Sequence, residues 1–383
     1  MKKLVVVLLV LVSLLGCSKK EPEPVTPEET YEEKINKIVS ELDGSKYYFY
    51  RQLNDQQRFY YAQLEDALAN GKDELEFTDK DNRPVIKEFY KAQVAFEYDH
   101  PLYWWLHDSV GDTIGTKIKK VTYNGRPEES VLKQINDKVD EVIAGMPAGL
   151  SEVQKFEYLY EWVILNTRYE LDSEFNQDVR SVFLNGVSVC NGYAKAYQLL
   201  CQRAGLECGY NHGISSRPDW ESGFHAWNFV RIADRYYWVD STWGDEADET
   251  LPYDYSWFCM TDEEFFQTRV ADSGINVFGY GEPNGAYKLP ESTDHSMNHF
   301  VRNGSYFETA DKDAIKAYIT RALENNEYIE LQFADADTMA KGYKYLTDNF
   351  IKIATSVLGS NQKGKWVMYQ LRLTNCVLIG KAH

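Results

Sequence analysis

The stretch that decides the fold is Val187–Leu206, VSVCNGYAKAYQLLCQRAGL, in which a cysteine stands directly before an Asn-Gly pair where a helix is about to begin. Apolar residues recur along it at helical spacing, and Gly205 is suited to a left-handed helix end. A thiol in the first turn of a helix lies in the positive field of the unpaired backbone amides, which favours thiolate over thiol. We therefore predict that Cys190 is nucleophilic, that its own amide can donate to an oxyanion, and that Gly192 leaves room for a substrate carbonyl.

A cysteine at the start of a helix is also typical of a small core residue, so its role depends on distant partners. The segments HAWNFVRI and RYYWVDSTW read as two strands joined by a tight turn. If Ile232 pairs with Arg235, His225 and Asp240 become diagonal neighbours on one face, within reach of a hydrogen bond. The carboxylate would orient the imidazole and stabilise its protonated form, while the other ring nitrogen addresses Cys190. The alternative is a core histidine that happens to share a hairpin face with an aspartate.

Together, VCNGYAKAYQLLCQRAGL and GFHAWNFVRIADRYYWVDSTWGD resemble the bacterial transglutaminase-like superfamily, a branch of the papain-like cysteine enzymes. The shared pattern is a cysteine before x-G-Y-A, then H-A-W-N, then V-D-x-T-W. By this resemblance Cys190, His225 and Asp240 are the nucleophile, the base and the orienting acid. The sequence departs from the usual pattern at Ser188, where a glycine is common. The resemblance implies an α+β fold, in which the nucleophile helix packs on an antiparallel sheet.

The resemblance also implies acyl transfer at a peptide, amide or isopeptide bond through a thioester on Cys190. Water as acceptor gives a hydrolase, which we favour, and a lysine amine gives a crosslinking transglutaminase. Tyr169 lies where members of the superfamily often carry a tyrosine and is a candidate oxyanion donor, with ordinary packing as the alternative. A hypothesis of another class is a catalytically silent surface adaptor or binding lipoprotein built on the same core. No cofactor and no metal are expected.

The domain organisation follows from changes in pattern along the chain. Residues 31–148 are helix-rich, with helical spacing in DQQRFYYAQLEDAL and PVIKEFYKAQVAFEY. Residues 149–292 hold the transglutaminase-like segment. Residues 293–383 follow a Gly/Pro/Ser-rich stretch and show a small α/β pattern, in which HFVRNGSYF reads as a hairpin. We predict a helix-rich N-terminal domain, a catalytic domain and a C-terminal α/β domain.

The N-terminus, MKKLVVVLLVLVSLLGC, has two lysines before an apolar run too short to span a membrane as a mature helix. Residues 1–16 read as a signal peptide and resemble a bacterial lipoprotein signal, which implies acylation at Cys17. An ordinary signal peptide is the alternative. Residues 17–30, rich in Pro and Glu, would form a solvated tether. We expect an extracytoplasmic protein of the cell envelope, attached to a bacterial membrane by lipid.

Composition narrows the choice of partners. The formal charge of −18 makes nucleic acid and anionic lipid poor ligands. The resemblance to the transglutaminase-like superfamily implies a protein or peptide substrate, with cell-wall peptide among the candidates. Of six cysteines, one is assigned to lipid, so at least one of the others is unpaired. A bond between Cys201 and Cys208 is open. His295 and His299 have the spacing of metal ligands on a helix, but no third ligand accompanies them.

Overall fold

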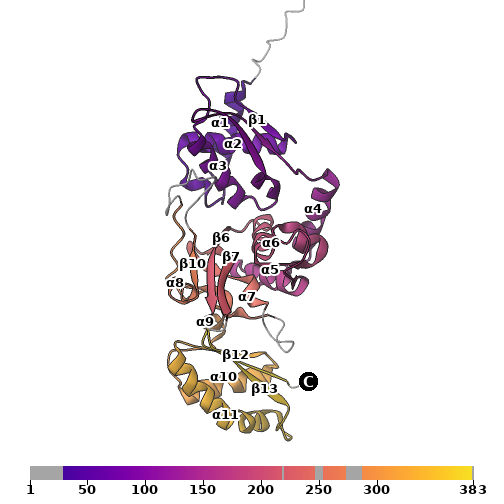
Figure 1. Cartoon of the computed structure of the whole chain (residues 1–383). Coiled ribbons are helices and arrows are strands. Elements are labelled where there is room, and N and C mark those ends of the chain that lie inside the picture. The colour runs from indigo at the N-terminus through magenta and orange to yellow at the C-terminus, as the bar shows by residue number, and fades with distance from the viewer. Residues whose placement is uncertain (1–28, 218–219, 246–252, 273–286, 382–383) are drawn as a thin grey trace, which may run out of the picture.

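The computed structural model describes residues 29–217, 220–245, 253–272 and 287–381. The predicted signal peptide and the lipidation site at Cys17 lie outside the described residues. Three parts follow one another along the long axis of the molecule, from the indigo N-terminal helices to the yellow C-terminal layer (Figure 1). Within the described ranges, every helix falls short of the length and apolarity needed to cross a bilayer.

The N-terminal part packs helices against a small antiparallel sheet. Its helices are α1 (Tyr31–Leu42), α2 (Asp55–Ala69) and α3 (Ile86–Asp99), and its sheet has the order β1-β3-β2, from Glu74–Glu76, Lys117–Tyr123 and Ser109–Ile114. Helix α2 begins at a capping box, in which Asn54 and Gln57 each accept the other's backbone N–H. The two helices predicted from apolar spacing are confirmed as α2 and α3.

The middle part is an antiparallel sheet of five strands with the order β10-β6-β7-β8-β9. Their bounds are Arg269–Ala271, Cys208–Arg217, Trp220–Ile232, Arg235–Val239 and Phe258–Met260. Helix α6 (Cys190–Arg203) packs on this sheet, where the side-chain amide of Asn228 donates to the Ala194 carbonyl at 3.0 Å. The predicted fold, a nucleophile helix on an antiparallel sheet, is therefore confirmed (Figure 1).

Two helices pack beside α6, namely α4 (Glu129–Ala144) and α5 (Glu152–Asn166). Short elements complete the middle part: β4 (Arg168–Tyr169), β5 (Val187–Ser188), α7 (Ser241–Gly244) and α8 (Asp262–Phe265). The predicted register is also confirmed, because Ile232 pairs with Arg235 in the β7–β8 hairpin. Both turn residues, Ala233 and Asp234, have positive φ, as a two-residue turn between right-twisted strands requires.

The C-terminal part is a four-stranded sheet with the order β11-β12-β14-β13 and two long helices. Its elements are α9 (His299–Asn303), β11 (Tyr306–Phe307), α10 (Lys312–Asn325), β12 (Ile329–Phe333), α11 (Ala336–Leu358), β13 (Trp366–Leu371) and β14 (Cys376–Lys381). The hairpin predicted for HFVRNGSYF is wrong. Asn298 caps a short helix there, and the Asn-Gly pair ends that helix, with Gly304 at a φ of 67°.

The apolar core of the N-terminal part is continuous with one face of the middle sheet. Phe229 and Trp238 of the sheet belong to the same buried cluster as Phe49 of the N-terminal part. The rings of Tyr48 and Phe229 meet edge to face, with centroids 4.7 Å apart. The N-terminal helices therefore stabilise the strand that carries His225.

Candidate functional site

Cys190 is the first residue of α6, and no side chain caps the helix at Val189. The field of the first backbone amides is therefore left to act on the thiol, as predicted from the sequence. Cys190 is partly exposed and packs against a small buried cluster of Ala194, Tyr210 and Ala226.

Gly192 has a different role from the one predicted. It is buried, and a Cβ at this position would lie 2.0 Å from the hydroxyl oxygen of Ser188 and 2.6 Å from that of Ser181. These two hydroxyls hydrogen-bond to each other at 2.6 Å. The glycine thus lets the start of α6 pack on the two serines, and it does not open a path for substrate. Ser188, the departure from the usual pattern, faces Gly192.

His225 lies between Cys190 and Asp240. Its Nε2 is 2.7 Å from Oδ2 of Asp240, and the thiol of Cys190 lies close enough to its ring to raise the pKa of the imidazole. Because Asp240 is bound to Nε2, Nδ1 is the ring nitrogen that remains to face the thiol. The structure thus brings together the three side chains predicted from the sequence, in the predicted order. Their catalytic roles stay a prediction.

Asp240 is fully buried and has four partners. Its Oδ1 accepts the backbone N–H groups of Thr242 at 3.1 Å and Trp243 at 3.0 Å. Its Oδ2 accepts from His225 and from the guanidinium of Arg269, which is also fully buried. The carboxylate is thereby fixed at the end of β8 and orients the imidazole.

The electrostatics of the site favour a charged histidine. Burial alone would raise the pKa of Asp240, but His225 and Arg269 lower it well below its usual range. Burial alone would lower the pKa of His225, but the Asp240 carboxylate and the Cys190 thiol raise it to about 9. With Asp240 already balanced by Arg269, an imidazolium at His225 adds one positive charge next to Cys190. A thiolate there would neutralise that charge.

Sequence reasoning missed Arg269. It lies on β10, a strand of three residues, and its guanidinium is 3.8 Å from the ring centre of Trp243 and 4.2 Å from that of Phe265. The strand pairs with β6, so Arg269 reaches Asp240 across the sheet. No motif surrounds Arg269 in the sequence, and only the β10–β6 pairing brings it to the site.

Tyr169 lies on β4, which pairs with β5 just before α6, and is 44% exposed. Its ring centre is 6.3 Å from that of Tyr193. The structure thus places Tyr169 near the start of α6, and its role as an oxyanion donor stays a prediction.

The described cysteines are all free thiols: Cys190, Cys201, Cys208, Cys259 and Cys376. The possible bond between Cys201 and Cys208 is therefore not formed. Burial raises the pKa of Cys208 and of Cys259 well above the usual value. Among these five thiols Cys190 is the one that is not fully buried, which favours it as the reactive one.

His295 and His299 pair with different carboxylates and do not converge. His295 is 3.3 Å from Glu264, whereas His299 lies between Glu157 at 3.0 Å and Glu330 at 3.1 Å, one on each ring nitrogen. Across the described ranges no cluster of three or more His, Cys, Asp or Glu side chains is arranged to hold a metal.

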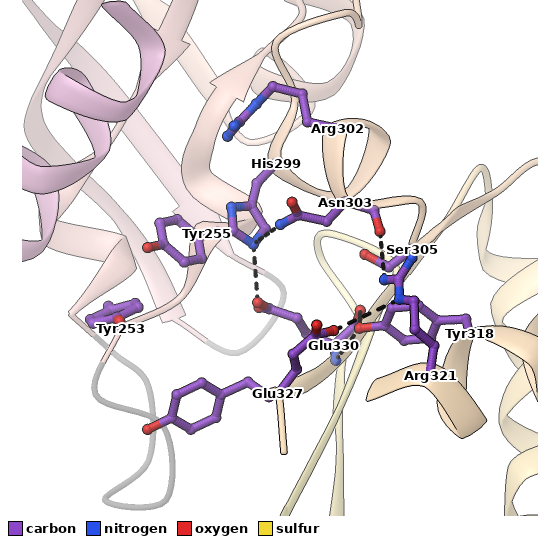
Figure 2. Close-up of a pocket in the computed structure, with 11 residues that line it drawn as sticks. Tyr253, Tyr255, His299, Arg302, Asn303, Ser305, Tyr318, Arg321, Glu327 and Glu330 are labelled. Atoms are coloured by element: carbon purple, nitrogen blue, oxygen red, sulfur yellow. Dashed lines mark hydrogen bonds and ion pairs between the residues drawn. The ribbon is translucent and has the colours of Figure 1, made fainter. Parts of the chain in front are cut away.

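His299 borders a cavity of about 640 Å³ at the junction with the C-terminal part (Figure 2). The ring of Tyr255 stacks on its imidazole at 3.8 Å, and Arg321 on the far side contacts Glu327. The lining residues do not include Cys190 or His225. The charged side chains at this cavity pair with one another. We interpret the junction as a structural contact that holds α5, α9 and β12 together.

This link predicts a pH-dependent stability. Burial alone would lower the pKa of His299, but Glu157 and Glu330 raise it to about 9. A folded pKa above the unfolded value means that the stabilisation is complete below about pH 6.5 and disappears as the pH rises through 9. We expect His299→Gln to remove up to about 3 kcal/mol of this pH-dependent stability, by urea unfolding at pH 6 and pH 9.5. His107→Gln, at a 92% exposed side chain, is the control and should change the difference little.

Residues 138–241 match the profile of the Transglutaminase-like superfamily. Kyphoscoliosis peptidase of Mus musculus is 24% identical over 136 residues, which are 32% of this chain and 20% of that protein. The protein of the same name from Homo sapiens is 23% identical over 149 residues, 35% of this chain and 22% of that protein. The matched region thus spans only about a fifth of the length of these curated relatives.

Two solved structures align with about a third of the chain. One is described as a TGase, with a TM-score of 0.28 and 14% identity over 35% of this chain and 44% of that chain. The other is described as a cysteine protease of Cytophaga hutchinsonii, with a TM-score of 0.25 and 15% identity over 33% of this chain and 51% of that chain.

Proposed function

Because residues 138–241 match the profile of the transglutaminase-like superfamily, we propose that this chain is a cysteine hydrolase or acyltransferase that acts through a thioester on Cys190. The observation that carries the proposal is the position of His225, which hydrogen-bonds to Asp240 and lies near the thiol of Cys190. Nucleophile, base and orienting acid in this arrangement are what acyl transfer requires.

In the proposed reaction the Cys190 sulfur attacks the carbonyl carbon of an amide, while the backbone amide of Cys190 donates to the oxyanion. The carbon–nitrogen bond then breaks, and His225 gives its proton to the leaving amine. Water attacks the thioester, His225 accepts the water proton, and the acid product leaves as the thiol is restored. Asp240 stabilises the imidazolium in both halves of the reaction.

We propose hydrolysis as the main outcome, because the curated relatives that match are named as peptidases. A lysine amine in place of water would give an isopeptide crosslink by the same steps. The proposed substrates are peptide, amide or isopeptide bonds of proteins or peptides outside the cytoplasm, with cell-wall peptide among them.

The first test is the pH dependence of Cys190 alkylation by iodoacetamide, in the wild type and in His225→Ala. We expect fast labelling well below the free-thiol pKa of about 8.5, and a loss of that acid reactivity in the variant. Intact mass and peptide mapping assign the label, with Cys190→Ala as the blank. An ordinary thiol profile in both proteins would contradict the proposal.

Turnover is then tested with a casein substrate, by following released peptides and the incorporation of an added amine. Cys190→Ala should abolish both signals, and release without incorporation indicates hydrolysis. Partner binding that is unchanged in Cys190→Ala, with no turnover in the wild type, would favour the silent adaptor.

We also propose that Cys17 carries a lipid anchor, on the ground of the leader sequence alone. Cys17→Ser should move the protein from the membrane fraction to the soluble fraction, since the anchor is the expected cause of membrane binding. Retention of Cys17→Ser in the membrane fraction would contradict this proposal, and Cys190→Ser is the matched control.

A further inference from the structure

Three large apolar side chains lie exposed in one row across the middle sheet. They are Phe224 on β7, Ile214 on β6 and Val270 on β10, with exposed fractions of 91%, 37% and 71%. Ile214 pairs directly with Phe224 on one side and with Val270 on the other. Side chains directly opposite on adjacent strands lie about 5 Å apart, so these three form a continuous apolar strip.

The strip lies next to the candidate nucleophile. Successive side chains of a strand alternate between faces, so Phe224 shares a face with Ala226, two residues along β7. Ala226 belongs to the cluster against which Cys190 packs. Two residues of strand span about 7 Å, so the strip begins about 7 Å along β7 from Ala226, which lies in the cluster that the thiol contacts.

We propose that Phe224, Ile214 and Val270 form a subsite that binds a large apolar side chain of the acyl donor, close to the bond that is cleaved. This inference rests on the proposed function. In the thioester, the carbonyl carbon of the acyl donor is bonded to the Cys190 sulfur. Each further residue of an extended donor chain lies about 3.5 Å farther from the thiol, so the first few residues can reach the strip. An apolar side chain would remove the strip from water, whereas a charged one would lose hydration without gaining a partner.

The test compares two thiol reagents on the full-length protein: iodoacetamide, and N-benzyl iodoacetamide, which carries an apolar arm. Rates of Cys190 labelling are measured by intact mass and divided by the rates for free glutathione. We expect the benzyl reagent to be favoured in the wild type by about five- to tenfold, as burial of part of a phenyl ring would give. Phe224→Ser combined with Val270→Ser should abolish this preference, which is the ratio of the two labelling rates within each protein.

Val110→Ser is the matched control, because Val110 is a strand valine with a similar exposure of 60% in the N-terminal sheet. It should change neither rate. An activated thiol without any preference for the benzyl reagent would overturn the subsite and leave the proposed function standing. A thiol that is not activated toward iodoacetamide would instead overturn the proposed function. Loss of a dimer in Phe224→Ser, with unchanged selectivity, would assign the strip to self-association and overturn the subsite.

Discussion

Replacing Arg269 by methionine should lower the free energy of unfolding by about 3–5 kcal/mol, as measured by urea denaturation at pH 7. The reason is the position of its partner. Arg269 and Asp240 are both fully buried, and the carboxylate would lose one of the two cations that lower its pKa. Methionine keeps an apolar side chain of similar length against Trp243 and Phe265, so the loss reports mainly on charge.

Two controls distinguish this effect from a general sensitivity to loss of arginine. Arg203→Met removes a partner of Asp140 at the surface, where the two side chains are 32% and 61% exposed, and should cost only about 0–1 kcal/mol. The double variant Arg269→Met/Asp240→Asn removes both buried charges and should be more stable than the sum of the single changes by at least about 2 kcal/mol. Strict additivity would show that the pair does not act as a unit.

The predicted parts of the site are those that depend on local pattern. Cys190 could be placed because apolar spacing and Gly205 define one helix and its start. His225 and Asp240 could be brought together because a two-residue turn fixes the register of a hairpin, and the register then fixes which side chains are diagonal neighbours.

What the sequence did not reveal depends on contacts between distant segments. Arg269 reaches Asp240 only because β10 pairs with β6, and a strand of three residues has too little pattern to predict that pairing. The pattern around Gly192 predicts an opening for substrate, because it does not show that the hydroxyls of Ser181, from a short helical segment, and Ser188, from β5, pack against the glycine. At Asn303-Gly304 the same dipeptide serves either a hairpin or a helix end, and the cap at Asn298 decides between them.

Asp240→Asn should remove the acid reactivity of Cys190 and lower amide turnover on the order of 10³–10⁴-fold, the size of effect seen when a triad loses its orienting carboxylate. The wild-type imidazolium persists to about pH 9, because Asp240 raises the pKa of His225. Without the carboxylate, burial dominates and the pKa of His225 falls below its ordinary value of about 6.5. The alkaline limb of the pH–rate profile should therefore move from near pH 9 to below about pH 6.5.

The variant Asp240→Asn leaves Arg269 buried without its carboxylate, so it can lose activity by unfolding as well as by losing the orienting acid. A second variant distinguishes the two effects. The double variant Asp240→Asn/Arg269→Met restores the charge balance, and its Cys190 should still lack the wild-type acid reactivity in the iodoacetamide assay. If the double variant unfolds cooperatively yet keeps the wild-type acid reactivity, the activation of Cys190 comes from the start of α6 and not from the carboxylate. The two sources are separable because the helix field acts on the thiol directly, whereas Asp240 acts only through His225.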